Sequence, residues 1–378
     1  MIEIWKRTEL EKLMRSHGLR FSKGLGQNFL TDRNILEKIV AGAELSADDH
    51  VVEIGSGLGA LTVFLAQEAG RVTAVEIDRR LIPALREATE GLANIDIVNE
   101  DFLKFEFSSP ATGSADAAEK PSVTTRHAEG PDMPTVIAGS GDAPDMPTVT
   151  TGSADAPDMP TITTGSGDAA TRQSTKVVGN LPYNITTPII AKLFEQEPSR
   201  NTAPPADGTE RRPQPHPSTG HTAPPSDCSH VVPVPAPGKP RPSLAVFMMQ
   251  KEVAERLLSP PGKKAYGAIS VLVQYYTDAE LLFEVSREVF VPKPNVDSAV
   301  VRFRPKDLSA DDAETAARMF RLVRAGFDMR RKTLRNSLAR AGFPEADLLS
   351  ALESAGIDPG RRAETLSSRD FYTLAAAL

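Results

Sequence analysis

Predicted strands that alternate with predicted helices constrain the fold of this chain most strongly. Mainly apolar runs at 51–54, 72–75 and 95–98, each with one polar residue, are typical of strands. Segments with apolar residues at helical spacing, 61–69 and 79–89, follow the first two runs. Alternation of this kind is typical of parallel sheets covered by helices, so the sequence predicts an α/β fold.

The turn after the first strand indicates a nucleotide-type site. Gly55–Gly59 follows the strand directly, and Glu53 lies two residues before it. Glycines at such a turn let the backbone approach a ligand closely. The spacing is G-x-G-x-G, not the G-x-G-x-x-G of dinucleotide sites. With an acid that can serve an ammonium group, this pattern favours S-adenosylmethionine over a pyrophosphate.

Acidic residues end the second and third strands. Glu76 directly follows the second apolar run, where a carboxylate can accept hydrogen bonds from both ribose hydroxyls. Asp78, two residues later, is predicted to cap the next helix. Asp101 follows the third strand and is placed to accept from an adenine amine, with Phe102 beside the ring. Three consecutive strand ends therefore predict a cofactor site.

The segment Asn180-Leu181-Pro182-Tyr183 follows another short strand, 177–178. The Asn side-chain oxygen and a nearby backbone carbonyl can accept hydrogen bonds from one exocyclic amine, and Tyr183 can stack on its base. Methylation of an adenine N6 requires such a site, because the amine is a poor nucleophile while its lone pair is delocalised. A helix-capping Asn followed by a turn explains the tetrapeptide alone equally well.

Two further loops carry candidate ligand contacts. Gln27 and Asn28 end a glycine-rich loop, for which turn chemistry is the simpler interpretation, and Thr31 or Asp32 is predicted to cap a helix at 33–43. Two prolines stiffen the loop that presents Phe290. Phe290 is either a second stacking face for a flipped base or an anchor in the core.

Two low-complexity segments interrupt the pattern, and we predict both to be disordered insertions. Residues 108–175 repeat PDMPTV or PDMPTI every 13 residues and have almost no apolar surface. Residues 198–243 are rich in proline. Four residues of the second segment could bind a metal, but a solvated loop is the better interpretation and we predict no metal site. These residues are His216, His221, Cys228 and His230.

For contact with nucleic acid, the distribution of charge along the chain matters more than its net charge of −7. The segment 108–175 has nine acidic and three basic residues, a balance of −6, whereas 318–340 has eight basic residues and one acidic residue, a balance of +7. A local basic patch favours contact with a phosphate backbone. Within it, cations cluster at the start of a helix predicted at 329–341. They are Arg330, Arg331, Lys332 and Arg335.

Residues after 305 are predicted to be entirely helical, which divides the chain into two domains. Residues 1–305, with the two insertions, form the first domain, and 306–378 form a helical domain for RNA contact. The single cysteine, Cys228, excludes a disulfide framework. The first residues are charged, and no apolar run approaches the length of a membrane span. We therefore expect a cytoplasmic monomer with no membrane partner.

Taken together, these residues resemble the ribosomal RNA adenine N6,N6-dimethyltransferases, and specifically the universal small-subunit enzymes. The matching motifs span nearly the whole chain outside the two insertions. They are GQNFL (26–30), EIGSGLG (53–59), VEID (75–78), EDF (100–102), NLPYNI (180–185), QKEVAERL (250–257), YGAISVLVQYY (266–276), VFVPKPNVDSAVVRF (289–303) and RRKTLRN (330–336).

The resemblance implies a Rossmann-like S-adenosylmethionine-dependent methyltransferase sheet with one antiparallel strand, followed by a small all-helical C-terminal domain. It also implies that the chain dimethylates two adjacent adenines near the 3′ end of small-subunit (16S) rRNA, on a pre-ribosomal particle. Matching motifs imply cofactor contacts at Asn28, Leu30, Gly55, Glu76, Asp101 and Asn180, and base contacts at Tyr183 and Phe290.

Three alternatives compete with this interpretation. A large-subunit rRNA adenine methyltransferase of the resistance type shares the chemistry, but GQNFL, NLPYNI and NVDSAV favour the small-subunit enzyme. A non-catalytic RNA-binding assembly factor is disfavoured by the intact NLPY segment and the cofactor acids. A nicotinamide-dependent oxidoreductase is disfavoured by the G-x-G-x-G spacing and by the absence of residues for hydride transfer.

Overall fold

A computed structural model describes residues 2–21, 27–106, 174–182, 185–194, 242–308 and 312–378. Residues Met1–Pro110 and Gln173–Leu378 belong to one compact unit, which includes every described residue. A second unit, Ala111–Arg172, lies outside the described residues, within the first predicted insertion. Tyr183 and the four candidate metal ligands also lie outside them.

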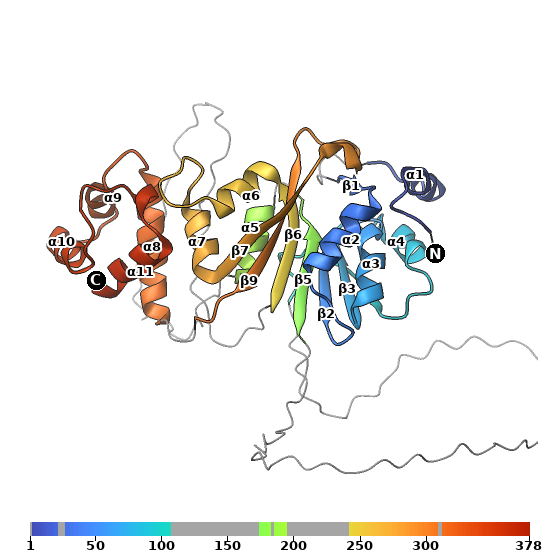
Figure 1. Cartoon of the computed structure of the whole chain (residues 1–378), viewed down its shortest axis with the longest axis horizontal. Helices are drawn as coiled ribbons and strands as arrows, with labels where there is room; N and C mark the ends of the chain where they lie inside the picture. The colour runs from blue at the N-terminus through green and yellow to red at the C-terminus, as the bar shows by residue number, and fades with distance from the viewer. Residues whose placement is uncertain (1, 22–26, 107–173, 183–184, 195–241, 309–311) are drawn as a thin grey trace, which may run out of the picture. The chain divides into compact units, whose positions relative to one another are not determined.

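A seven-stranded sheet forms the centre of the described unit (Figure 1). In spatial order its strands are β4 (Ile95–Asn99), β3 (Arg71–Glu76), β2 (His50–Ile54), β5 (Thr175–Asn180), β6 (Leu244–Gln250), β9 (Ser298–Pro305) and β7 (Thr277–Val285). Strand β9 pairs antiparallel with β6 and β7, and the other pairs in the sheet are parallel. The predicted fold class, including its one antiparallel strand, is confirmed.

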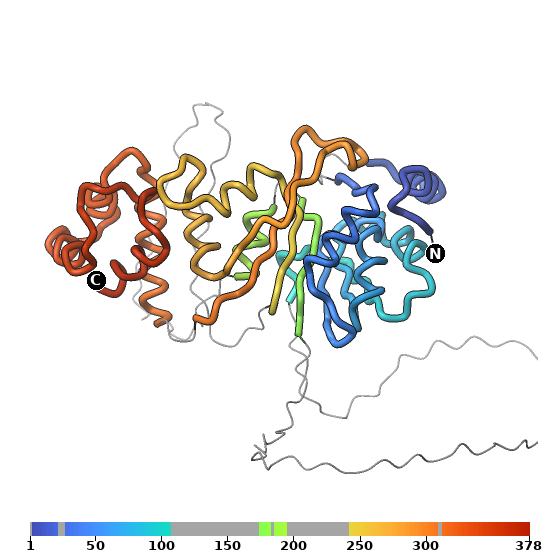
Figure 2. Tube along the Cα trace, in the orientation of Figure 1, coloured from blue at the N-terminus to red at the C-terminus, as the bar shows by residue number. Residues whose placement is uncertain are grey.

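Helices cover both faces of this sheet, and the tube in Figure 2 follows the chain between them. Those before β9 are α1 (Arg7–Ser16), α2 (Arg33–Gly42), α3 (Ala60–Glu68), α4 (Ile82–Ala88), α5 (Thr186–Phe194), α6 (Lys251–Leu258) and α7 (Ala268–Tyr276). After β9 come α8 (Ala313–Asp328), α9 (Leu334–Arg340), α10 (Glu345–Ser354) and α11 (Ser368–Ala377). Single 3₁₀ turns occur at Arg287–Val289 and Ala363–Thr365.

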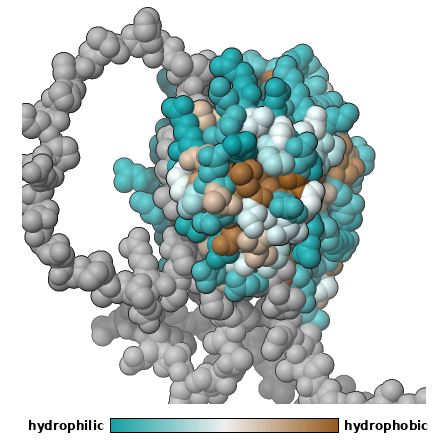
Figure 3. Space-filling view, turned by 90° about the vertical axis from the view of Figure 1, so that its left-hand side faces the viewer, coloured by the Kyte–Doolittle hydropathy of each residue, from teal (hydrophilic) through white to brown (hydrophobic). Residues whose placement is uncertain are grey.

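Alternation along the strands builds two hydrophobic clusters. Val178 packs in one cluster with apolar residues of α2 and α3, whereas its neighbour Val177 packs in the other with α5 and α7. Successive side chains of a strand point to opposite faces, so a continuous apolar run buries both faces of the sheet. The cluster around Val177 continues into α8–α11. Figure 3 views this helical end, where hydrophilic side chains surround a small hydrophobic area.

Several predicted boundaries were wrong, each for a local reason. Helix α4 begins at Ile82, where a proline occupies its first turn, so Asp78 does not cap it. Helix α9 begins at Leu334, because Thr333 accepts a hydrogen bond from the Asn336 N–H as its N-cap. Arg330, Arg331 and Lys332 therefore lie in the loop before α9. Asp32, one of two predicted caps, caps α2.

The sequence did not predict a second, two-stranded sheet. Strand β1 (Phe29–Leu30) pairs antiparallel with β8 (Phe290–Val291). Strands of two residues show no periodicity, and these two lie far apart in the sequence. Their pairing fastens the segment after the glycine-rich N-terminal loop to the loop before β9. The Thr31 N–H, donating to the Val289 carbonyl at 2.8 Å, extends this contact by one residue.

The described residues that follow each insertion lie at the amino ends of the central strands. Ser174 and Ser243 directly precede β5 and β6, and the Ser243 N–H donates to the Thr175 carbonyl at 2.8 Å. Phe194, before the second insertion, contacts Phe303 through tilted rings whose centroids lie 5.7 Å apart, and Phe303 pairs with Ala245 of β6. Thr175 belongs to β5, so the predicted boundary of the first insertion was wrong by one residue. Ser174 and Ser243 therefore lie opposite the strand ends that carry the predicted site, whereas residues 101–106, before the first insertion, follow the carboxyl end of β4.

Candidate active site

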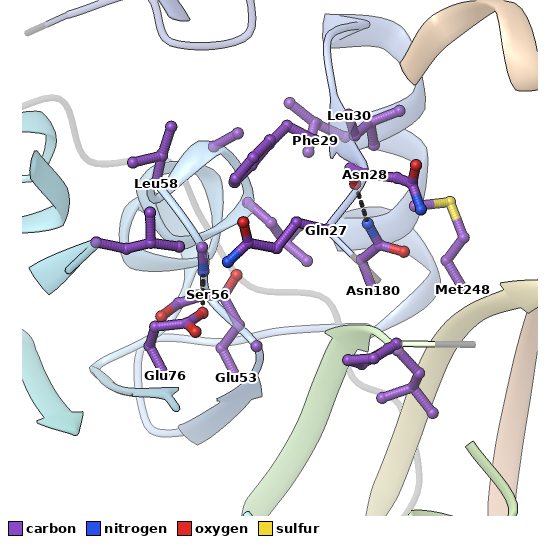
Figure 4. Close-up of a pocket in the computed structure, with 18 of the residues that line it drawn as sticks. Gln27, Asn28, Phe29, Leu30, Glu53, Ser56, Leu58, Glu76, Asn180 and Met248 are labelled. Carbon is purple, nitrogen blue, oxygen red and sulfur yellow. Dashed lines mark hydrogen bonds between the residues drawn. The ribbon is translucent and has the colours of Figure 1, made fainter. Parts of the chain in front are cut away.

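A pocket lies at the carboxyl ends of β2, β3 and β5, the usual ligand position in an open α/β sheet. It brings together seven of the residues predicted from sequence: Asn28, Leu30, Gly55, Glu76, Asn180, Leu181 and Pro182. Figure 4 shows polar side chains from three segments converging on it, namely the N-terminal loop, the glycine-rich turn and the end of β5. Glu53, predicted to serve an ammonium group, lines it too. Of the other predicted site residues that the structure describes, none lines this pocket: Asp101, Phe290, Arg330, Arg331, Lys332 and Arg335.

The glycine-rich turn lets two segments approach closely. Gly55, Gly57 and Gly59 all have positive φ, which disfavours other residues. A Cβ on Gly57 would lie 3.1 Å from Cε1 of Phe29, which also lines the pocket. A side chain at this position would therefore push the N-terminal segment away from the turn.

Two buried carboxyl groups face the pocket beside this turn. Glu53 is 2% exposed, and its Oε2 accepts a hydrogen bond from the Thr62 hydroxyl at 2.5 Å. Burial, opposed by the Thr62 hydrogen bond and reinforced by the nearby Glu76 carboxyl, raises the pKa of Glu53 to about 8. Glu53 is therefore protonated at neutral pH and prefers to ionise only beside a cation. A ligand ammonium group would supply that cation.

Glu76 is held by backbone donors on both sides. Its Oε2 accepts from the Gly57 N–H at 2.7 Å, and its Oε1 accepts from the Asp78 N–H at 2.8 Å. Burial raises its pKa, while these hydrogen bonds oppose the shift. The carboxylate is thereby fixed in orientation at the pocket wall. A fixed carboxylate at the end of the second strand can accept from vicinal hydroxyls.

A buried serine hydroxyl in the turn also fits a ligand. Among the described residues, Ser56 Oγ has no hydrogen-bond partner although its side chain lies in the pocket wall. Buried polar atoms are nearly always paired, so an unpaired one in a pocket indicates a missing ligand group. The residues of this pocket therefore fit S-adenosylmethionine: acids for its ammonium and ribose, a glycine turn, and an unpaired hydroxyl.

Asn180 lies in the pocket between the two acids predicted to hold the cofactor, Glu53 and Glu76, and the opposite wall. Its Nδ2 donates to the Asn28 carbonyl at 3.1 Å, which directs Oδ1 away from that contact (Figure 4). The following residue is anchored as well, since the Leu181 N–H donates to the Met248 carbonyl at 2.9 Å. A Cβ on Gly179 would lie 2.8 Å from the Ile54 carbonyl, so β5 can reach this position only with glycine there.

Three residues predicted as contacts are not part of the lining of this pocket. Asp101 follows β4, and its Oδ1 accepts from the Leu103 N–H at 3.0 Å, within a turn beside the pocket. Phe102 is 4% exposed and packs in the core, so it presents no open ring face to an adenine. Phe290 is 2% exposed and packs in the cluster with α2 and α3. The structure thus favours the core-anchor interpretation of Phe290 that the sequence left open.

The predicted RNA-contacting cations differ in their bonding. Arg330 donates to the carbonyls of Tyr266 at 2.8 Å and Lys264 at 3.2 Å, and Arg335 forms an ion pair with Glu345. Arg331 and Lys332 are exposed, and their side chains have no hydrogen bond or ion pair within the described residues. Arg330 therefore links its loop to the segment before α7, and Arg335 links α9 to α10. Arg331 and Lys332 remain available to a phosphate backbone.

Sequence reasoning missed a polar contact that closes the pocket. The Gln27 side chain donates to Asp78 Oδ2 at 2.9 Å, and Arg80 holds the same carboxylate through its backbone N–H and its guanidinium. The Arg80 hydrogen bonds lower the pKa of Asp78 to about 2. Asp78 therefore fixes the N-terminal segment to the end of β3. The amide pair Gln27-Asn28 was the sequence signal for it.

Comparison with known proteins gives consistent matches over the whole chain. A family model described as ribosomal RNA adenine dimethylase matches residues 18–378. The ribosomal RNA small subunit methyltransferase A of Bacillus mycoides is 36% identical over 372 residues, covering 97% of this chain and 94% of that protein. The protein of the same name from Bacillus cereus (strain AH187) matches with the same identity and coverage.

Two solved structures share the fold. A dimethyladenosine transferase from Plasmodium falciparum has a TM-score of 0.58 and 22% identity, covering 92% of this chain and 95% of that one. The 23S rRNA methyltransferase ErmE has a TM-score of 0.55 and 22% identity, covering 93% and 99% respectively. At this identity the two structures show the architecture and do not separate one RNA substrate from the other.

Proposed function

The chain belongs to the ribosomal RNA adenine dimethylase family, and we propose that it transfers methyl groups from S-adenosylmethionine to N6 of two adjacent adenines near the 3′ end of small-subunit (16S) rRNA. One observation carries this proposal: the segment 180–182 lines the same pocket as the glycine-rich turn and Glu76. A methyl acceptor at Asn180 and a nucleoside cofactor at Glu76 would therefore meet in one cavity.

S-adenosylmethionine, when bound, supplies an electrophilic methyl group. The chain would hold it through the turn 55–59, with Glu53 toward its ammonium group and Glu76 toward its ribose hydroxyls. The Ser56 hydroxyl would gain its missing partner. Asn28 and Leu30, from the N-terminal segment that Asp78 and Asn180 hold in place, would close the pocket over it.

Asn180 would activate the acceptor by hydrogen bonding. Its Oδ1 and a neighbouring backbone carbonyl would each accept a hydrogen bond from the target amine, which withdraws the nitrogen lone pair from the adenine ring. The N–C bond forms as the S–C bond breaks, and the methylated nitrogen then loses a proton to solvent. Positioning and polarisation account for catalysis, since the nitrogen becomes acidic only after it is methylated.

Substrate contacts extend from the pocket to the helical region. Tyr183 lies outside the described residues, directly after Pro182, and its ring would stack on the flipped base. Arg331 and Lys332 would contact the phosphate backbone, with the helical region 306–378 as the docking part for a pre-ribosomal particle. Their exposure and their lack of described partners support this division of roles.

Transfer of labelled methyl groups to purified subunits tests the proposal. Small and large ribosomal subunits from cells lacking this protein would be incubated separately with the chain and S-adenosylmethionine. We expect label in the rRNA of the small subunit only. Label in the large subunit alone would instead support the resistance-type reaction. Cofactor binding without transfer to either subunit would support an assembly factor.

A further inference from the structure

A lysine outside the pocket is bonded to the turn that carries Asp101. Lys192 lies on α5 and is half-buried, and its Nζ donates to the carbonyl oxygens of Phe102, at 2.8 Å, and Phe105. The same ammonium group lies 5.4 Å from the centroid of the Phe102 ring, within range of a cation–π contact. These three contacts all reach one short segment, 101–105.

This segment forms a single helical turn. The Asp101 carbonyl accepts from the Lys104 N–H at 2.8 Å and from the Phe105 N–H at 3.0 Å, while Asp101 Oδ1 accepts from the Leu103 N–H. One isolated turn is unstable by itself. The Phe102 carbonyl accepts within the turn from the Phe105 N–H at 3.2 Å, and Lys192 adds a second donor to it as well as a donor to the Phe105 carbonyl. An ammonium group at the end of a helical turn also interacts favourably with its dipole, so Lys192 stabilises this turn.

Helix α5 connects this turn to the opposite wall of the pocket. Thr186, the first residue of α5, donates through its hydroxyl to the carbonyl of Pro182 at 3.2 Å, and Pro182 lines the pocket. On its other side the turn continues from the strand end beside the cofactor acid, where the Glu100 N–H donates to the Glu76 carbonyl at 3.1 Å. The two ends of α5 thus hold the methyl-acceptor segment and the Asp101 turn.

We propose that Lys192 is a positioning residue for the cofactor. By holding the turn 101–105 from α5, it keeps the Asp101 carboxylate where the adenine of S-adenosylmethionine binds. This inference rests on the proposed function and on the predicted role of Asp101. A lysine that only stabilised the fold would change the melting temperature without a selective effect on cofactor affinity, so the two roles are separable.

Calorimetric measurement of S-adenosylmethionine binding, together with steady-state kinetics, separates a positioning role of Lys192 from a purely structural one. We expect Lys192→Met to raise the Kd and KM for the cofactor about tenfold, within the usual range of coupling between sites, and to change kcat by less than about twofold. Lys192→Arg, which keeps the charge, should restore most of the affinity. If the Met variant does not fold, Lys192→Gln gives the same comparison with a neutral donor.

Lys176 provides a matched control. It is also a half-buried lysine that donates to a backbone carbonyl, that of Glu44, and it pairs with Asp49 at 2.9 Å, at the amino end of β5. Lys176→Met should lower the melting temperature and leave the cofactor Kd unchanged. An equal rise in Kd for both variants would show a general loss of structure and would overturn the proposal.

A double-mutant cycle tests whether Lys192 affects cofactor binding through Asp101. Asp101→Asn should weaken cofactor binding, and Lys192→Met should weaken it little further in that background. A full additional loss there, or an unchanged Kd for Lys192→Met in the native background, contradicts the inference. If the native chain binds no S-adenosylmethionine at all, the proposed function fails instead, so the two failures are distinguishable.

Discussion

At the scale of single residues, the pocket combines fixed polar groups with one group left unpaired. Glu76 is oriented by two backbone donors, and Asn180 is oriented by the Asn28 carbonyl. The Ser56 hydroxyl has no partner within the described residues. Groups that are oriented before a ligand arrives lose little freedom on binding, which favours both affinity and catalysis.

Asn180→Ala tests the role of the amide in activating the acceptor. We expect cofactor binding within about threefold of the native chain and a single-turnover methylation rate lower by at least about a hundredfold, the usual cost of removing such a group. Single-turnover assays with saturating cofactor measure this rate directly. An unchanged rate would reject the role of Asn180 in catalysis.

Glu76→Ala tests the ribose assignment. Loss of the carboxylate removes the acceptor for the ribose hydroxyls and frees the N–H of Gly57, so we expect the cofactor Kd to rise at least about tenfold. Calorimetry gives the affinity, and the melting temperature of the unliganded variant serves as the control for folding. Native affinity in a folded variant would contradict the assignment.

Glu53→Gln tests the raised pKa of the buried acid. Its pKa is about 8 in the folded chain, against an ordinary value of 4.5. Between pH 4.5 and pH 8 the folded state therefore binds a proton that the unfolded state has lost. Stability from this group therefore falls as pH rises from 4.5 through 8, by on the order of a few kcal/mol. Gln keeps an acceptor for Thr62 and cannot ionise.

We therefore expect Glu53→Gln to raise the melting temperature of the unliganded chain, relative to the native chain, much more at pH 8.5 than at pH 5.5. The variant should also bind the cofactor more weakly, because a neutral amide cannot pair with its ammonium group. Thermal unfolding of both proteins at the two pH values measures the difference. The same shift at both pH values would contradict the raised pKa.

At the scale of secondary-structure elements, the ends of strands and the loops between helices carry the function. The sequence predicted the strand ends correctly because apolar runs and the glycines and acids after them are local signals. It failed for β1 and β8, which are too short to show a period, and for the loop before α9, where Thr333 sets the helix start. Only the structure shows that Arg330 donates hydrogen bonds to backbone carbonyls of the same chain.

The loop before α9 gives a prediction about RNA docking. Replacing Arg331 and Lys332 together by Gln should weaken binding to small subunits and reduce the slope of log affinity against log salt by roughly two, if each contacts one phosphate. Cofactor affinity and melting temperature should not change. Filter-binding titrations at several salt concentrations measure the slope.

Arg330→Gln is the matched variant for this loop. Its guanidinium donates to two backbone carbonyls, so its loss should lower the melting temperature while the salt slope stays nearly constant. The opposite outcome, with Arg330 setting the slope and Arg331 and Lys332 setting stability, would show that the division between holding and docking cations is wrong.

At the scale of the whole molecule, the site and the described residues that follow each insertion are at opposite ends of the strands. The pocket lies at the carboxyl ends of β2, β3 and β5, whereas Ser174 and Ser243 lie at the amino ends of β5 and β6. None of the described helices is long and apolar enough to cross a membrane. Composition predicted the insertions, but only the topology shows where their ends attach.

Replacing residues 108–172 tests how independent the catalytic unit is. A glycine-serine linker of about a dozen residues, which spans roughly 40 Å when extended, would connect the flanking segments. We expect the melting temperature to change by less than about 3 °C and the cofactor Kd to stay the same, because the core and pocket are built from residues outside this segment. A large loss of stability would show that the insertion supports the fold.

Mass-spectrometric mapping of the product tests the central claim most directly. Small subunits from cells lacking the protein would be treated with the native chain and S-adenosylmethionine, with Asn180→Ala as the blank, and their rRNA would be sequenced by fragment mass. The account predicts N6,N6-dimethyladenosine at two adjacent positions near the 3′ end, and far less of it from Asn180→Ala in the same reaction time. Methylation at another atom or base, or an equal product from Asn180→Ala, would contradict it.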